Sequence, residues 1–141
     1  MDIVLVEDNP ADAELTLDAL ETHRLSNRMT VLKDGEEALD FFFGRGKYAG
    51  CDTGRQPCVV LLDLKLPKID GTEVLRALRA DQRTKTLPVV VLTSSQEHRD
   101  IVRSYDLGAN SYIVKPVEFE KFAEAVAEIG LYWVLMNEPP S

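Results

Sequence analysis

Three carboxylates in this chain stand directly after apolar runs. Asp63 follows the run from Val59 to Leu62, and Glu7 and Asp8 follow the short run from Asp2 to Val6. Four apolar residues in succession are typical of a strand buried on both faces of a parallel sheet. In such sheets functional groups lie just beyond the carboxyl ends of the strands. A buried Asp63 would also need a metal or another cation beside it, because an unpaired buried charge is costly.

Two later apolar runs are also followed directly by a polar residue, as the runs before the three acids are. Thr93 follows one of them, and Lys115, which precedes Pro116, follows the other. If the strands are parallel, these groups meet the three acids at one edge of the sheet. Carboxylates about 4 Å apart repel each other by on the order of 4 kcal/mol at an effective dielectric near 20, and a hard divalent cation removes that repulsion. Mg²⁺ fits best because it leaves positions for water and phosphate, and a lysine and a hydroxyl opposite the acids complete a phosphoryl site.

Apolar runs alternate with stretches of helical character along the chain. The strands are expected at Asp2–Val6, Thr30–Leu32, Val59–Leu62, Val89–Leu92 and Ser111–Val114, and the helices at Ala11–Thr22, Glu36–Phe43, Thr72–Arg79, Gln96–Leu107 and Glu118–Met136. Asn9 is a suitable N-cap for the first helix, with Pro10 as its first residue, and Gly108 is a suitable left-handed end for the fourth. This order predicts an open parallel sheet with helices on both faces and right-handed crossovers.

Length and charge narrow the class of protein. The chain has 141 residues, so a single domain over 1–141 is expected. The net charge of −8, from 16 basic and 24 acidic residues, argues against direct DNA binding and against docking on anionic membranes. No run has the length of a transmembrane helix, so a cytoplasmic protein is expected. Reduced thiols are then the favoured state of Cys51 and Cys58.

The combined pattern resembles the receiver domain of bacterial two-component response regulators. The residues that carry the resemblance are Glu7-Asp8, Asp63 with Pro67 and Gly71, Thr93, and Lys115-Pro116. The resemblance covers the whole chain and implies a flavodoxin-like (βα)5 fold, a doubly wound α/β arrangement with strand order 2-1-3-4-5. It also implies a signalling protein that catalyses only its own phosphorylation and dephosphorylation, not an enzyme acting on other substrates.

The resemblance assigns a role to each site residue. Asp63 is expected to accept a phosphoryl group from a phosphohistidine of a partner histidine kinase. Glu7, Asp8, Asp63 and the backbone carbonyl of Lys65 are expected to hold Mg²⁺. Of the remaining groups, Thr93 would hydrogen-bond the phosphoryl group and Lys115 would form an ion pair with it.

Two further features follow from the same resemblance. The Lys115-Pro116 bond is expected to be cis. Tyr112 matches the switch aromatic of the family, which turns inward when Thr93 is drawn toward the phosphate. For Tyr112, simple packing is the alternative.

Finer features resemble the small response regulators of phytochrome-type histidine kinases. They are the VEDNPAD segment, the extended loop from Gly44 to Pro57, the SYDLGANSYIVKP segment and an aromatic C-terminal helix. Such regulators carry no output domain. The segment from Leu131 to Met136 is apolar on every side of a helix, so part of it is expected in a homodimer contact or folded back over the last strand.

Several interpretations stay open. Lys65 and Ser95 either tune hydrolysis of the phosphoryl group or are solvated polar residues, and His23 and His98 are expected at the surface. A metal-dependent phosphohydrolase with an aspartyl intermediate usually has a second acid two residues after the nucleophile, and here that residue is Lys65. A flavodoxin-like nucleotide binder would need a glycine-rich loop where this chain has acids.

Overall fold

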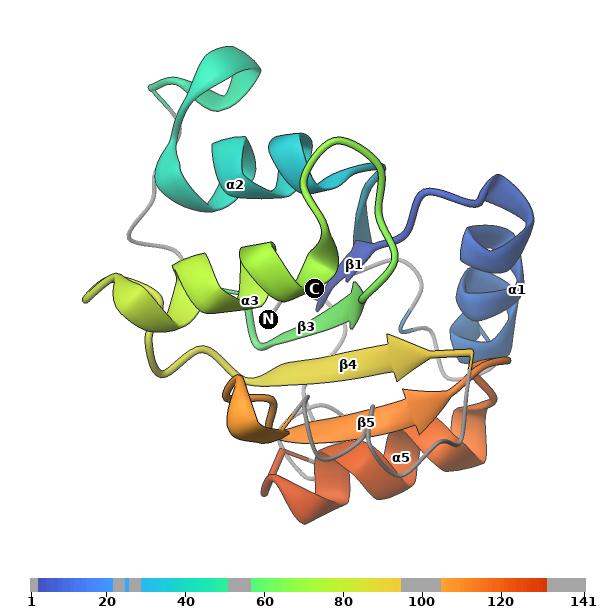
Figure 1. Ribbon diagram of the computed structural model, residues 1–141. Coiled ribbons are helices and arrows are strands. Elements are labelled where there is room, and N and C mark those ends of the chain that lie inside the picture. The colour runs from blue at the N-terminus through green and yellow to red at the C-terminus, as the bar shows by residue number, and fades with distance from the viewer. Residues whose placement is uncertain (1–2, 22–24, 26–28, 51–56, 95–104, 132–141) are drawn as a thin grey trace.

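The computed structural model describes residues 3–21, 25, 29–50, 57–94 and 105–131. Its strands are β1 (Ile3–Val6), β2 (Met29–Leu32), β3 (Val59–Asp63), β4 (Val89–Thr93) and β5 (Ser111–Val114). Its helices are α1 (Pro10–Glu21), α2 (Gly35–Phe43), α3 (Gly71–Ala80) and α5 (Phe119–Glu128), with a short 3-10 helix, η2 (Gly46–Tyr48). The strands form one parallel sheet in the order β2-β1-β3-β4-β5, which confirms the expected flavodoxin-like fold (Figure 1).

The place of each strand in the sheet follows from its composition. β1, β3 and β4 are buried along their whole length, as expected of strands that are covered on both faces. The edge strands β2 and β5 contain residues that are only partly buried. The three central strands therefore bring their carboxyl ends to the middle of one edge of the sheet, where β1 and β3 deliver acids.

Alternate residues of the central strands pack into two separate cores. Ile3 and Leu5 of β1 lie in the core under α1 and α5, together with Phe122. Val4 and Val6 lie in the core under α2 and α3. Figure 1 shows the same two layers, with α2 and α3 on one face of the sheet and α5 on the other. Helices therefore cover both faces of the sheet, and a functional site can be accessible only at the edge where the strands end.

Short-range capping interactions set where α1 and α2 begin. Asn9 Oδ1 accepts hydrogen bonds from the backbone N–H groups of Ala11 at 2.9 Å and Asp12 at 3.1 Å, and Pro10 is the first residue of α1. This confirms the predicted N-cap. Asp34 caps α2 in the same way, through the N–H of Glu37 at 2.7 Å. Both helices therefore start directly beside the carboxyl ends of their strands.

The last helix is shorter than the sequence predicts. A continuous helix from Glu118 to about Met136 is wrong, because α5 ends at Glu128 and Gly130 has a positive φ of 79°. The N–H of Leu131 donates to the carbonyl of Val126 at 2.8 Å, and the N–H of Gly130 donates to that of Ala127 at 3.1 Å. This pair of bonds is a Schellman motif, which satisfies the terminal carbonyls and turns the chain away from the helix axis.

Some predictions concern residues outside the described ranges. They include most of the expected helix from Gln96 to Leu107, the side chains of Ser95, His23, His98 and Cys51, and residues 132–136 of the segment Leu131–Met136, part of which was expected in a homodimer contact. These stay predictions. Within the described part of the chain, no helix is both long and apolar enough to cross a lipid bilayer.

Candidate functional site

The C-terminal edge of the sheet gathers the side chains that the sequence places after its apolar runs. Glu7 follows β1, Asp63 ends β3, Thr93 ends β4 and Lys115 follows β5. Strand register brings them level: Val6 pairs with Leu62, and Thr93 pairs with Val114. The N–H of Lys115 then donates to the carbonyl of Thr93 at 2.8 Å. Groups as much as 108 positions apart are therefore neighbours at one rim.

The ammonium group of Lys115 lies at the centre of this edge. Its Nζ is 2.5 Å from Asp63 Oδ2 and 2.5 Å from Glu7 Oε1. Burial lowers the pKa of Lys115, but the neighbouring carboxylates of Asp63 and Glu7 outweigh that effect, so the pKa is raised overall. Lys115 therefore stays charged and acts as the counter-charge to two buried acids.

Glu7 is buried beside a second carboxylate. Its side chain is almost fully enclosed, at 1% exposure, and Asp63 lies next to it. Burial, followed by the neighbouring Asp63, raises the pKa of Glu7 from 4.5 to about 7, although Lys115 acts in the opposite direction. Glu7 Oε1 contacts the ammonium outside hydrogen-bonding geometry, and it is a buried side-chain oxygen without a hydrogen-bond partner in the described residues.

These acids form a group that fits a divalent cation. One carboxylate oxygen from each of Glu7, Asp8 and Asp63 lies within 4.8 Å of the others, and Asp8 is open to solvent. Mg²⁺ and related hard cations bind carboxylate oxygens of this kind. Glu7 Oε1, which has no hydrogen-bond partner in the described residues, is therefore available as a metal ligand. The N–H of Lys65 donates to Asp63 Oδ1 at 3.0 Å, which holds the Lys65 backbone against the same carboxylate. The four predicted metal ligands thus come from the carboxyl ends of the paired strands β1 and β3 and from the residues that follow them.

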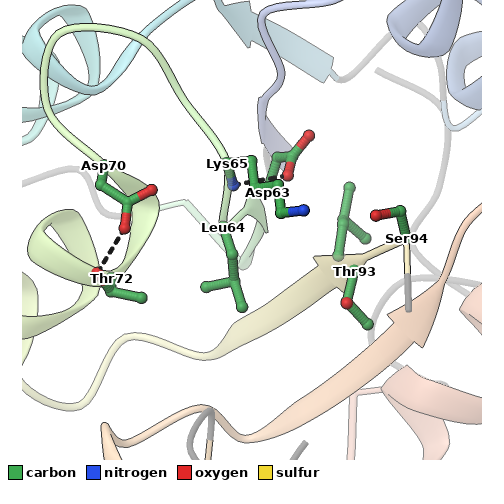
Figure 2. A pocket seen from close by; sticks show the side chains of 8 residues that line it. Asp63, Leu64, Lys65, Asp70, Thr72, Thr93 and Ser94 are labelled. Atoms are coloured by element: carbon green, nitrogen blue, oxygen red, sulfur yellow. Dashed lines mark hydrogen bonds between the residues drawn. The ribbon is translucent and has the colours of Figure 1, made fainter. Parts of the chain in front are cut away.

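A cleft of about 230 Å³ opens over Asp63. Figure 2 shows Asp63 between the two sides of this cleft, with Asp70 and Thr72 on one side and Thr93 and Ser94 on the other. The Thr72 hydroxyl donates to Asp70 Oδ2 at 2.7 Å, so this carboxylate is held on the α3 side of the cleft. Thr93, the last residue of β4, lines the same cleft as Asp63.

A tight backbone contact fixes the loop after Asp63. The N–H of Gly71 donates to the carbonyl of Leu64 at 2.9 Å, which closes the loop between β3 and α3. A Cβ at position 71 would lie 2.2 Å from the backbone oxygen of Asp63, so no side chain fits there. On the other side of the site, the Lys115-Pro116 bond is cis, as the resemblance implies. Both features constrain the backbone beside a site residue, which is Asp63 in the first case and Lys115 in the second.

The structure adds groups that reasoning from the sequence missed. Asp12, in the first turn of α1, has its Oδ2 at 3.3 Å from Lys115 Nζ. Asp70, Thr72 and Ser94 line the cleft. The available signal for Asp12 was its place in the first helical turn after β1, next to the edge where the strands end. Tyr112, by contrast, was predicted, and its ring packs edge-on against Tyr105 at 6.2 Å.

Known proteins resemble this chain over nearly its whole length. The probable methanogenesis regulatory protein FilR2 of Methanothrix harundinacea is 44% identical over 139 residues, which is 98% of this chain and 86% of that protein. The bacteriophytochrome response regulator AtBRR is 52% identical, with a TM-score of 0.86 over 97% of each chain.

A third relative is known with a metal. The Mn²⁺-bound form of the response regulator Rcp1 is 33% identical over the full length of both chains, with a TM-score of 0.74. A curated Rcp1, from Synechocystis, is 36% identical over 132 residues, or 94% of this chain and 88% of that protein. The family model of the response regulator receiver domain matches residues 3–127, which include every predicted site residue. The chain therefore belongs to the response regulator receiver domain family, a family of signalling proteins.

Proposed function

We propose that this protein is a phosphorylation-controlled signalling switch that accepts a phosphoryl group on Asp63 from a partner histidine kinase. The observation that carries the proposal is the contact of Asp63 with Lys115 and Glu7 at the head of an open cleft. Membership of the receiver family supports the same reading. Asp63 is the one of these carboxylates that the cleft exposes to a donor.

The residues divide the transfer between them. An oxygen of Asp63 forms a bond to phosphorus while the bond between phosphorus and the imidazole nitrogen of the phosphohistidine breaks and leaves its electron pair on that nitrogen. Lys115 would neutralise the charge of the phosphoryl oxygens, and the Thr93 hydroxyl would hydrogen-bond one of them. Mg²⁺, held by Glu7, Asp8, Asp63 and the backbone carbonyl of Lys65, would supply the positive charge that makes the approach of two anions favourable.

The partner we infer is a sensor kinase of the phytochrome type. Support comes from AtBRR, which is a bacteriophytochrome response regulator and matches 97% of this chain. In this proposal the protein works in the cytoplasm, signals through protein contacts without binding DNA, and has no reaction beyond its own phosphorylation and dephosphorylation. A switch at Thr93 and Tyr112, and a homodimer contact that involves part of Leu131–Met136, belong to the same proposal.

Replacement of the acceptor tests the chemistry. Wild type and Asp63→Asn are incubated with acetyl phosphate and Mg²⁺, and intact mass reports the added phosphoryl group. We expect label on wild type, none on Asp63→Asn, and none in EDTA. Asp70→Asn is the matched control, because it removes a carboxylate from the other side of the same cleft. Label that persists on Asp63→Asn would refute the assignment.

The kinase class needs a separate assay. Phosphotransfer is followed from each histidine kinase of the same genome, with a phytochrome-type kinase expected to be the fastest donor. Sizing before and after transfer measures the homodimer. If kinases of another type are the faster donors, the phytochrome assignment fails while the phosphoacceptor role remains.

A further inference from the structure

Asp12 is a third carboxylate at the Lys115 ammonium. Lys115 Nζ donates hydrogen bonds to Asp12 Oδ2 at 3.3 Å and to Asp63 Oδ2 at 2.5 Å. Its contact with Glu7 is as short but lies outside hydrogen-bonding geometry. An ammonium group has three N–H donors, and Asp12 accepts one of the two hydrogen bonds that this group makes here.

Asp12 differs from the other two acids in position. Glu7 and Asp63 are buried and belong to the group that fits a cation, whereas the Asp12 side chain is 40% exposed on α1 and is not part of that group. The backbone of Asp12 is engaged within its own helix: its N–H donates to Asn9 Oδ1 and its carbonyl accepts from the Thr16 hydroxyl. The carboxylate is thus the part of Asp12 that reaches out of the helix to the site.

We propose that Asp12 is a positioning residue that competes with the phosphoryl group on Asp63 for the Lys115 ammonium. The inference rests on the proposed function. When Glu7 and Asp63 bind a cation, their electrostatic attraction for the Lys115 ammonium weakens. The Asp12 carboxylate does not bind that cation, so its negative charge remains available to pair with the ammonium. A phosphoryl group must then draw the ammonium away from the α1 side.

The expected effect of removing this competitor is tighter binding of a phosphoryl analogue. Beryllium fluoride is titrated in the presence of Mg²⁺, with bound fluoride followed by ¹⁹F NMR. Asp12→Asn keeps the shape and the backbone bonds, and we expect it to bind about two- to five-fold more tightly, the range of a partly exposed ion pair. Asp18→Asn, the same change at an exposed position of α1, should leave the affinity as it is in wild type.

A double-mutant cycle separates positioning from simple repulsion. If Asp12 acts through the ammonium, Asp12→Asn has no effect on affinity in a Lys115→Gln background. A gain of the same size in that background means that Asp12 acts through space, and this overturns the proposal. Where Lys115→Gln does not bind the analogue, the side-chain ¹⁵N resonance of Lys115 decides, because it should shift in Asp12→Asn and not in Asp18→Asn.

The two failures are distinguishable. Wild type that does not bind beryllium fluoride contradicts the proposed function. Wild type that binds it with an affinity that Asp12→Asn leaves unchanged contradicts only the role of Asp12.

Discussion

Lys115 Nζ lies 2.5 Å from Asp63 Oδ2, although the two residues are 52 positions apart. The same ammonium lies 2.5 Å from Glu7 Oε1. One lysine that follows the edge strand β5 thus contacts Glu7, which follows β1, and Asp63, the last residue of β3. The stability of the protein and the chemistry of its site are therefore coupled through one side chain.

Removal of this ammonium should destabilise the metal-free protein. Lys115→Gln leaves Glu7 and Asp63 buried without a counter-charge, so we expect the free energy of unfolding in EDTA to fall by about 2–4 kcal/mol. Saturating Mg²⁺ should recover part of that loss, because the cation supplies the missing charge. Urea unfolding with EDTA and with Mg²⁺ measures both. Lys85→Gln, at an exposed site, is the control, and an equal loss in the two buffers would contradict the expectation.

Glu7 should make the metal-free protein less stable as pH rises. Its pKa is raised from 4.5 to about 7, so the folded state binds the proton more tightly than the unfolded state does. The stabilising contribution is therefore complete below pH 4.5 and is lost as pH rises through about 7. Glu7→Gln cannot ionise, so it should gain stability relative to wild type, by on the order of 1–3 kcal/mol, between pH 5 and pH 8 in EDTA.

Urea unfolding at these two pH values checks the Glu7 expectation. Glu14, which is exposed on α1, provides the control Glu14→Gln, whose difference from wild type should not grow between them. The idea is lost if Glu7→Gln differs from wild type by the same amount at pH 5 and at pH 8. With added Mg²⁺, wild type should become more stable than Glu7→Gln, because the variant lacks one metal ligand.

A side chain at position 71 should disturb the site through the backbone. The Cβ of Gly71→Ala would lie 2.2 Å from the Asp63 oxygen and 2.6 Å from Leu64 Cα, and backbone atoms have little room to move. We expect a loss of about 2–3 kcal/mol and weaker Mg²⁺ binding, whereas alanine at an unhindered helical position would be stabilising. Unfolding and calorimetric metal titration measure the two effects. Arg76→Ala, exposed on the same helix, should leave metal affinity unchanged; wild-type behaviour of Gly71→Ala in both assays would count against the contact.

Position 130 distinguishes a capped helix from a continuous one. Gly130 has a φ of 79°, so Gly130→Ala should lower the free energy of unfolding by about 1 kcal/mol. In a helix that ran on to Met136, the same substitution would raise it by about 1 kcal/mol. Gly50→Ala is a matched control, because Gly50 also has a positive φ and a Cβ added there would meet nothing within 4 Å. Thermal or urea unfolding that shows stabilisation at 130 alone would restore the longer helix.

Local patterns were enough to predict an open parallel sheet with helices on both faces, whereas the strand order was implied by the family resemblance. Strands buried on both faces leave unbroken apolar runs such as Val59 to Leu62, and parallel connectivity then sends the residues that follow them to one edge. Asn9 and Pro10 likewise mark the start of α1 through bonds within three residues. These signals are short-range, so sequence alone carries them.

Packing between distant segments decided the rest. Sequence spacing does not say how far Asp12 on α1 stands from Lys115 after β5, so its contact with the ammonium appears only when the two elements are docked. The apolar pattern runs on past Gly130 and favours a longer helix, yet the chain satisfies its last carbonyls with a left-handed glycine instead. The sequence determined which groups could react and at which edge they would meet. The tertiary structure decided which of them touch, because contact depends on distances between elements that no local pattern encodes.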